Sequence, residues 1–149
     1  VDAVPLLSRA TEVNKSSWHA YYTLGVALVE INRREEGIAA LRRAVALNQH
    51  SPNLNMRLGL ELAKEPKAQD EAIRALLQAS RLAGKELPDA YFYLASVYAK
   101  QEKYAEAANS LESYLSALPR LDPSQGEQYR KAIDQLRKKA SARASKKPE

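Results

Sequence analysis

The chain has 149 residues, no cysteine and a formal net charge of +5. Without cysteine it can form neither a disulfide nor a thiolate metal site, and it has no cysteine nucleophile. No apolar run reaches the ~18 residues that a membrane-spanning helix needs, and no alternating run favours a strand. The length predicts one domain, and the abundance of Ala, Leu, Glu, Arg and Lys predicts an all-α fold.

The positive charge is concentrated at one end of the sequence. Residues 137–149 carry six basic residues and one acidic residue, whereas the preceding residues carry seventeen of each sign. The basic character therefore belongs to the C-terminal segment. Such a segment can bind an anionic partner, but charge runs of this kind are more often solvated.

The first half of the chain predicts three helices. Residues 1–14 place Val4, Leu7, Ala10 and Val13 at helical spacing on one apolar face. A second helix follows Ser16 and Ser17, either of which can cap it. A third begins near Glu35, where acidic residues favour the positive end of the helix dipole. Asn32 in the intervening turn tolerates the left-handed conformation that ends a helix.

The second half predicts two further helix pairs and a last helix. One helix starts at Ser51–Pro52, a cap followed by proline at the first helical position. Pro66 predicts a longer, exposed turn, because proline cannot continue a helix. Another helix starts near Pro88, and the last helix follows Asp122–Pro123 with one apolar face, formed by Tyr129, Ala132, Ile133 and Leu136. Beyond about Ala140 the polar, basic run is expected to fray.

The same pattern of small and large apolar residues recurs along the chain. Leu24–Gly25 returns as Leu58–Gly59 after 34 residues and as Leu94–Ala95 after a further 36. These small residues are predicted to let the paired helices approach closely. The second helices share a pattern of four positions, in register in three copies: Gly37, Leu41, Ala44 and Leu47; Ala72, Leu76, Ala79 and Leu82; Ala107, Leu111, Tyr114 and Ala117. Residues 1–14 carry the same pattern, so they are predicted to be the second half of a repeat.

This pattern resembles the tetratricopeptide repeat, which has a 34-residue period and a W-x2-L-G-x2-Y signature. The first copy reads Tyr21-x2-Leu24-Gly25-x2-Leu28, and the third reads Tyr91-x2-Leu94-Ala95-x2-Tyr98. The resemblance implies an all-α, right-handed α-solenoid of helix-turn-helix repeats. It would contain about three repeats, an N-terminal half repeat and a C-terminal capping helix.

Two residues depart from the family pattern. Asn55 stands where an aromatic residue is usual, and Tyr114 stands where a small residue is expected. A large ring at position 114 is predicted to push the next helix away and to make the stacking irregular from that point.

The expected organisation is one helical-repeat domain over 1–140 and a basic flexible tail. The parts are the half repeat 1–14, the repeats 18–51, 52–87 and 88–121, the capping helix 124–140 and the tail 141–149. A start at Val1, in the middle of a repeat, suggests a soluble fragment or processed piece of a longer chain. A signal or anchor could have been lost upstream, and the compartment stays open.

Motifs that could carry catalysis or bind a metal are scarce. Neither His19 nor His50 has a second ligand at the i+3 or i+4 spacing of a metal site. The sequence contains no Gly-rich phosphate loop and no nucleophile elbow. We therefore expect no enzyme activity, no cofactor and no bound metal.

The resemblance implies that the first helix of each repeat lines a concave groove. The expected peptide-binding groove residues are Tyr22, Val26, Met56, Arg57, Leu60, Phe92, Tyr93, Ser96 and Lys100. Their apolar members would form a contiguous strip, and such strips usually mark an interaction site. Some family members clamp a terminal carboxylate with Lys and Asn, but the aromatic and Met side chains here do not support that clamp.

The leading functional hypothesis is a protein–protein interaction scaffold that binds a peptide or helical segment in this groove. The identity of the protein or peptide partner stays open, and self-association through the groove or the N-terminal end is an alternative occupancy. The runner-up hypothesis is binding of nucleic acid or another anionic surface through the basic C-terminal tail. It is the weaker one, because the rest of the chain is neutral and predicts no basic stripe.

Overall fold

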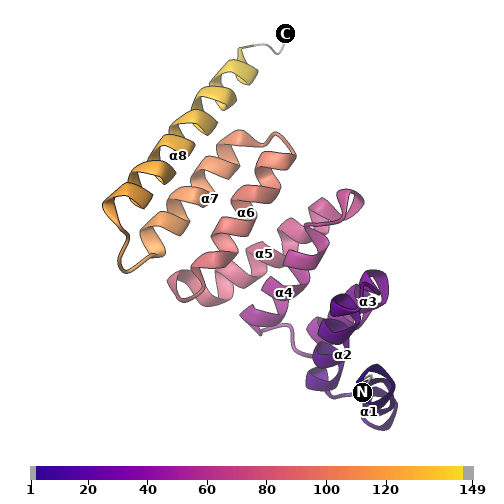
Figure 1. The fold of residues 1–149 in the computed structure, drawn as a ribbon. Coiled ribbons are helices and arrows are strands. Elements are labelled where there is room, and N and C mark those ends of the chain that lie inside the picture. Colours follow the sequence, from indigo (N-terminus) through magenta and orange to yellow (C-terminus); the bar gives the residue numbers. More distant parts are fainter. Residues whose placement is uncertain (1–2, 146–149) are drawn as a thin grey trace. The chain divides into compact units, whose positions relative to one another are not determined.

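The computed structural model describes residues 3–145, which form eight α-helices and no strand (Figure 1). Two short 3-10 segments, η1 and η2, flank the fifth helix. The elements are α1 (Val4–Val13), α2 (Trp18–Glu30), α3 (Arg34–Leu47), α4 (Pro52–Leu62), η1 (Pro66–Ala68), α5 (Gln69–Ala83), η2 (Gly84–Glu86), α6 (Pro88–Lys100), α7 (Tyr104–Ala117) and α8 (Pro123–Ala144). None of the described helices combines the length and apolar composition that crossing a membrane requires.

The chain forms two compact units, and their boundary lies within α5. The first unit ends at Ala75 and the second begins at Leu76. The all-α fold class predicted from the repeats is confirmed. The predicted repeat boundaries and the single domain over 1–140 remain predictions, and the two units are described in turn.

In the first unit each helix packs on the next, from α1 to α4. Val4, Leu24, Leu28 and Ala40 form one buried cluster, and Leu7 packs against it. This cluster joins α1 to the pair formed by α2 and α3. The burial of apolar side chains at helical spacing is the main favourable term for such a unit.

Two glycines set the distance between α2 and α3. A Cβ atom added to Gly25 would lie 2.8 Å from Cγ of Leu41, and one added to Gly37 would lie 2.8 Å from the Gly25 carbonyl oxygen. Side chains larger than hydrogen would therefore separate the two helices. Gly59 and Ala95, which repeat the Gly25 position, are also buried. The predicted close approach is confirmed at Gly25 and Gly37, and the predicted burial is confirmed at Gly59 and Ala95.

Local signals start the helices where the sequence predicts them. The backbone N–H of Ala20 donates to Oγ of Ser17 over 3.3 Å, and the N–H of Leu54 donates to Oγ of Ser51 over 3.3 Å. Asp122 caps α8 by accepting from the N–H of Ser124 over 3.1 Å. Each cap satisfies an N–H group that the helix itself leaves without a partner.

The turns follow two designs. Asn32 has φ 63° and Glu102 has φ 57°, so both tight turns place a left-handed residue between paired helices. The longer turn predicted at Pro66 is the 3-10 segment η1. The Gln69 side-chain amide donates to the carbonyl oxygens of Ala63 and Glu65 over 3.0 and 3.2 Å, which fixes this turn.

In the second unit α7 packs against both α6 and α8, and these three helices lie side by side in Figure 1. Ala95, Ala108, Leu111 and Ile133 form the buried cluster. The predicted apolar face of the last helix is confirmed, because residues from α8 complete this cluster. They are Tyr129, Ala132, Ile133 and Leu136.

Two expectations about helix packing are wrong in detail. Tyr114 does not push α8 away, because its ring lies 5.3 Å from the Phe92 ring and 5.3 Å from the Tyr129 ring and fills the space between them. The face predicted for residues 1–14 is only partly buried, since Val13 of α1 is 82% exposed. Thr11 is buried in its place, and its hydroxyl donates to the Ser8 carbonyl oxygen over 2.7 Å.

The last helix is also longer than expected. The capping helix was predicted over 124–140, but α8 continues to Ala144, so residues 141–144 of the predicted flexible tail are helical. Arg143 explains the extension. Its guanidinium forms an ion pair with the Glu102 carboxylate and donates to the Glu102 carbonyl oxygen over 3.1 Å. The rest of the predicted tail, 146–149, lies outside the described residues.

Candidate protein-interaction face

The structure places the predicted groove residues on three first helices. Tyr22 and Val26 lie on α2, and Met56, Arg57 and Leu60 lie on α4, all in the first unit. The second unit carries the others on α6, namely Phe92, Tyr93, Ser96 and Lys100. None of the nine is fully buried, and Phe92, Ser96 and Lys100 are exposed. All nine therefore have side-chain surface in contact with solvent.

The open and buried positions alternate along each first helix at helical spacing. On α4, Met56 and Leu60 are half-buried, whereas Leu58 and Leu62 are 5% and 0% exposed. On α6, Phe92 is 40% exposed and Leu94 is 2% exposed. Each helix thus has one face in the core and another that carries large apolar side chains toward solvent. Exposed apolar side chains at helical spacing can contact a partner.

Four aromatic rings on three helices gather in the second unit, and we call Phe92, Tyr93, Tyr114 and Tyr129 the aromatic cluster. The Phe92 ring centroid lies 6.0 Å from that of Tyr93 and 5.3 Å from that of Tyr114. Burial raises the pKa of Tyr114 to about 12, with a further contribution from its hydrogen bond to Tyr129. Phe92 and Tyr93 are predicted groove residues, whereas Tyr129 is predicted only on the apolar face of the last helix and Tyr114 only as a ring that pushes this helix away. The sequence signal for the role of Tyr114 in this cluster was a large residue at a position where the repeat has a small one.

A buried carboxylate lies beside the open positions of the first unit. Glu61 on α4 is 1% exposed, and its oxygens lie 2.9 Å from Nζ of Lys64, 3.4 Å from Arg57 and 3.9 Å from Arg34. Burying a carboxylate is costly unless cations and hydrogen bonds compensate it. Arg57, a predicted groove residue, therefore already has an acidic partner. The i−4 and i+3 spacing of Arg57 and Lys64 around Glu61 was the sequence signal.

Four basic residues of α8 also have partners within the second unit. Arg137 pairs with Glu112 over 2.6 Å, and Lys131 pairs with Glu127 over 2.8 Å. The Lys139 ammonium lies 5.5 Å from the centre of the Tyr104 ring. These contacts, with the Arg143 pair, connect α8 to its own turns, to α7 and to the turn before α7. A folding role thus accounts for much of the charge in this segment.

The described residues bring together no metal-binding group. Between residues 3 and 145, no three His, Cys, Asp or Glu side chains gather in a way that could hold a metal ion. The His19 ring instead stacks on Trp18, with ring centroids 3.3 Å apart. The first helices therefore present an apolar and aromatic surface, with a few charged side chains beside it.

These features define a helical-repeat protein built from paired helices, in which the first helix of a pair leaves one of its faces open. A family model described as tetratricopeptide repeat matches residues 2–60 and 70–126, which is more than half of the chain. The chain belongs to the tetratricopeptide repeat family. No curated protein matches it.

Solved structures with low sequence identity share the fold. A crystal structure of MamA has a TM-score of 0.75 at 22% identity, with 97% of this chain and 88% of that chain covered. YrrB, described as a TPR protein with an unusual peptide-binding site, has a TM-score of 0.73 at 23% identity, with 87% and 64% covered. The Yersinia enterocolitica type III secretion chaperone SycD, in complex with a peptide of the translocator YopD, has a TM-score of 0.68 at 16% identity, with 82% and 93% covered.

Proposed function

We propose that this protein is an interaction scaffold that binds a peptide or a helical segment of a partner on the open faces of its first helices. The observation that carries the proposal is the exposure of large apolar side chains on helices whose opposite faces are buried. In the first unit these side chains are Met56 and Leu60, and in the second unit they are Phe92 and the other members of the aromatic cluster. Peptide recognition commonly uses apolar anchors at helical spacing or aromatic-lined surfaces.

Two structures with the same fold support the proposal through their descriptions. YrrB is described as having a peptide-binding site, and SycD was solved with a bound peptide. Tetratricopeptide repeat proteins are typically non-enzymatic scaffolds. A scaffold role is therefore the ordinary expectation for this family.

A few large side chains should carry most of the binding free energy. Interfaces usually depend on a small set of central, well-packed residues. We assign this role to Met56, Leu60 and Phe92. Methionine adapts its shape to different neighbours, which suits a surface that accepts more than one peptide. The remaining predicted positions would contribute shape and rim polarity.

The alternative function, anion binding through the C-terminal segment, gains no support from the ion pairs of α8. Arg137 and Arg143 each have a carboxylate partner in the second unit. Binding a phosphate backbone would have to replace these pairs. We therefore keep peptide binding as the proposed function.

The test is selection of peptides from a random library against the wild-type protein, followed by affinity measurement with the synthetic peptides. The open-face variant carries Met56→Glu and Phe92→Glu. A matched control carries Ala46→Glu and Asn109→Glu, which add the same charge at exposed positions of α3 and α7. We expect the open-face variant to lose about tenfold or more in affinity and the control to retain it. Equal affinity of the two variants, both folded by circular dichroism, would refute the proposed face.

A further inference from the structure

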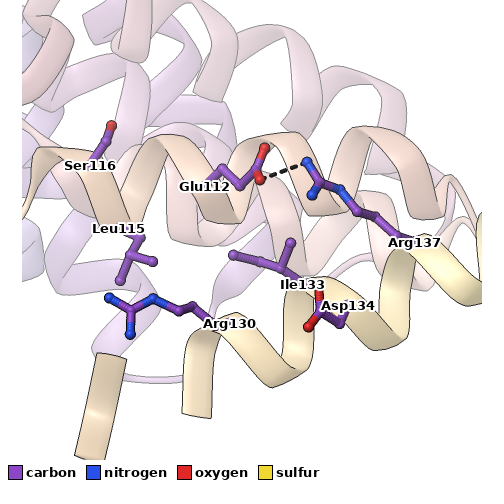
Figure 2. Close-up of a pocket in the computed structure, with 7 residues that line it drawn as sticks. All are labelled: Glu112, Leu115, Ser116, Arg130, Ile133, Asp134 and Arg137. Atoms are coloured by element: carbon purple, nitrogen blue, oxygen red, sulfur yellow. Dashed lines mark hydrogen bonds and ion pairs between the residues drawn. The ribbon is translucent and has the colours of Figure 1, made fainter. Parts of the chain in front are cut away.

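A pocket of about 450 Å³ lies between α7 and α8, within the second unit (Figure 2). Leu115 from α7 and Ile133 from α8 supply its apolar lining, and Glu112 and Ser116 border it on the α7 side. Ile133 is 4% exposed, so its position is fixed by the core. Small-molecule sites have volumes of roughly 300–1,000 Å³ and combine apolar walls with a few polar groups. The pocket falls at the lower end of that range.

The charges along the α8 side of the pocket differ in their partners. Arg137 is paired with Glu112 across the two helices, as Figure 2 shows. Arg130 has no ion pair with a carboxylate of residues 3–145, and its guanidinium lies over Gly126, with both terminal nitrogens 3.9 Å from the position that a Cβ there would take. The Arg130 head group thus packs over Gly126 at an ordinary van der Waals distance. Asp134 lies one helical turn further along α8, so a ligand with a second carboxylate would be repelled at that end of the pocket.

We propose that this pocket binds a small aliphatic carboxylate, with the carboxylate on Arg130 and the aliphatic group on Leu115 and Ile133. The planar guanidinium matches a carboxylate in both charge and hydrogen-bonding geometry. A branched aliphatic group would displace water from Leu115 and contact the small exposed part of Ile133. The hydroxyl of Ser116 donates to the Ser113 carbonyl oxygen over 3.0 Å, so its lone pairs can accept from an amide N–H of the ligand.

This site is separate from the proposed peptide-binding face. None of its lining residues belongs to the first helices, and the proposal stands whether or not those helices bind a peptide. The site is also open to solvent, since the Glu112 and Arg137 side chains at its edge are 43% and 54% exposed. We therefore expect weak, selective binding.

The experiment is an NMR titration of the whole chain with N-acetyl-leucine, and with its uncharged amide as the comparison ligand. We expect saturable shifts at the methyl groups of Leu115 and Ile133 and at the side-chain N–H of Arg130, with clearly weaker binding of the amide. Arg130→Gln should weaken N-acetyl-leucine binding about threefold, the range of an exposed charge pair. Gln is a good helix former, so the variant should stay folded.

The matched control is Lys131→Gln, which removes the neighbouring positive charge. Lys131 is 69% exposed, pairs with Glu127 and does not line the pocket. It should leave the affinity unchanged. Three results would each overturn the proposal: no saturable shift at Leu115 and Ile133, equal binding of the acid and the amide, or equal losses in the two variants.

Discussion

At the scale of single residues, Glu61 shows how a charged side chain becomes part of a core. Its carboxylate is 1% exposed, while the three surrounding cations keep 29–42% of their side-chain surface in water. The cations are therefore solvated on one side and neutralise a buried anion on the other. Such an arrangement avoids the full cost of burying a complete ion pair.

Glu61→Gln should lower the free energy of unfolding by about 1–3 kcal/mol, because it removes the charge that compensates the Nε atoms of Arg34 and Arg57, both buried without a hydrogen bond. Urea denaturation measures the change. The control is Glu65→Gln, whose side chain is 40% exposed and lies 3.8 Å from Arg34. It should cost less than about 0.5 kcal/mol. Equal losses would show that the burial of Glu61 has no energetic role.

Tyr114 predicts a loss of stability at alkaline pH. Its pKa is about 12 in the folded chain against an ordinary value of 10.0. Because the pKa is raised by folding, the unfolded chain releases the phenol proton at a lower pH than the folded chain. The contribution of Tyr114 to the free energy of unfolding is therefore complete below pH 10.0 and is lost as the pH rises through about 12. Tyr114→Phe should flatten the fall in unfolding free energy over this interval. An unchanged slope in urea titrations at successive pH values would contradict the assignment.

At the scale of elements, α8 closes the second unit with one buried face and several charged contacts. Ile133 is its most buried large side chain, in the cluster that also contains Leu111 and Ala108. The Arg137 and Arg143 pairs are more than half exposed on the arginine side, and exposed pairs contribute little. The apolar face should therefore supply most of the free energy that holds this helix.

Ile133→Ala should lower the free energy of unfolding by roughly 2–4 kcal/mol, through the lost burial and the cavity left behind. Gln135→Ala is the control, because Gln135 is an exposed position of the same helix. It should change stability by less than about 0.5 kcal/mol. Thermal and urea unfolding of both variants measure the difference, and comparable values for the two would remove α8 from the core.

Much of the fold could be predicted from the sequence because its signals are local. The caps at Ser17, Ser51 and Asp122 and the break at Pro66 depend on residues a few positions apart. The placement of Tyr114 depends instead on rings from two other helices. The functional face could be predicted only as a set of helix positions. The i, i+4 spacing of Arg57 and Glu61 indicates their pairing, but nothing local records that Glu61 is buried or that Arg34 of α3 joins the pair.

At the scale of the whole molecule, α1 carries an apolar stripe that no other described element covers. Leu6 is 68% exposed and Val13 is 82% exposed, whereas Ala40 and Ala75, in register with Leu6 in the later copies, are each 8% exposed. The two alanines thus show that this position of the repeat is buried in the later copies, whereas it is exposed in α1. The stripe is small compared with the ~800 Å² per partner of a stable interface.

We expect the chain to self-associate weakly at high concentration through this stripe. The variant Leu6→Glu, Val13→Glu should reduce the association. The Ala46→Glu, Asn109→Glu variant adds the same charge elsewhere and should not. Sedimentation velocity over a concentration series measures the effect. If both variants reduce association equally, general charge repulsion is responsible and the stripe has no role in self-association.

The boundary within α5 has a consequence for how the molecule melts. One uninterrupted helix contributes its first half to one unit and its second half to the other, so neither unit can unfold without fraying a helix on which the other depends. The chain's single tryptophan, Trp18, reports on the first unit, and six of the eight tyrosines lie in the second unit, so the tyrosine signal reports mainly on that unit. Tryptophan fluorescence and tyrosine circular dichroism should therefore give coincident transitions, the signature of a cooperative two-state process. A glycine placed in the middle of α5 should weaken this thermodynamic coupling and separate the two curves.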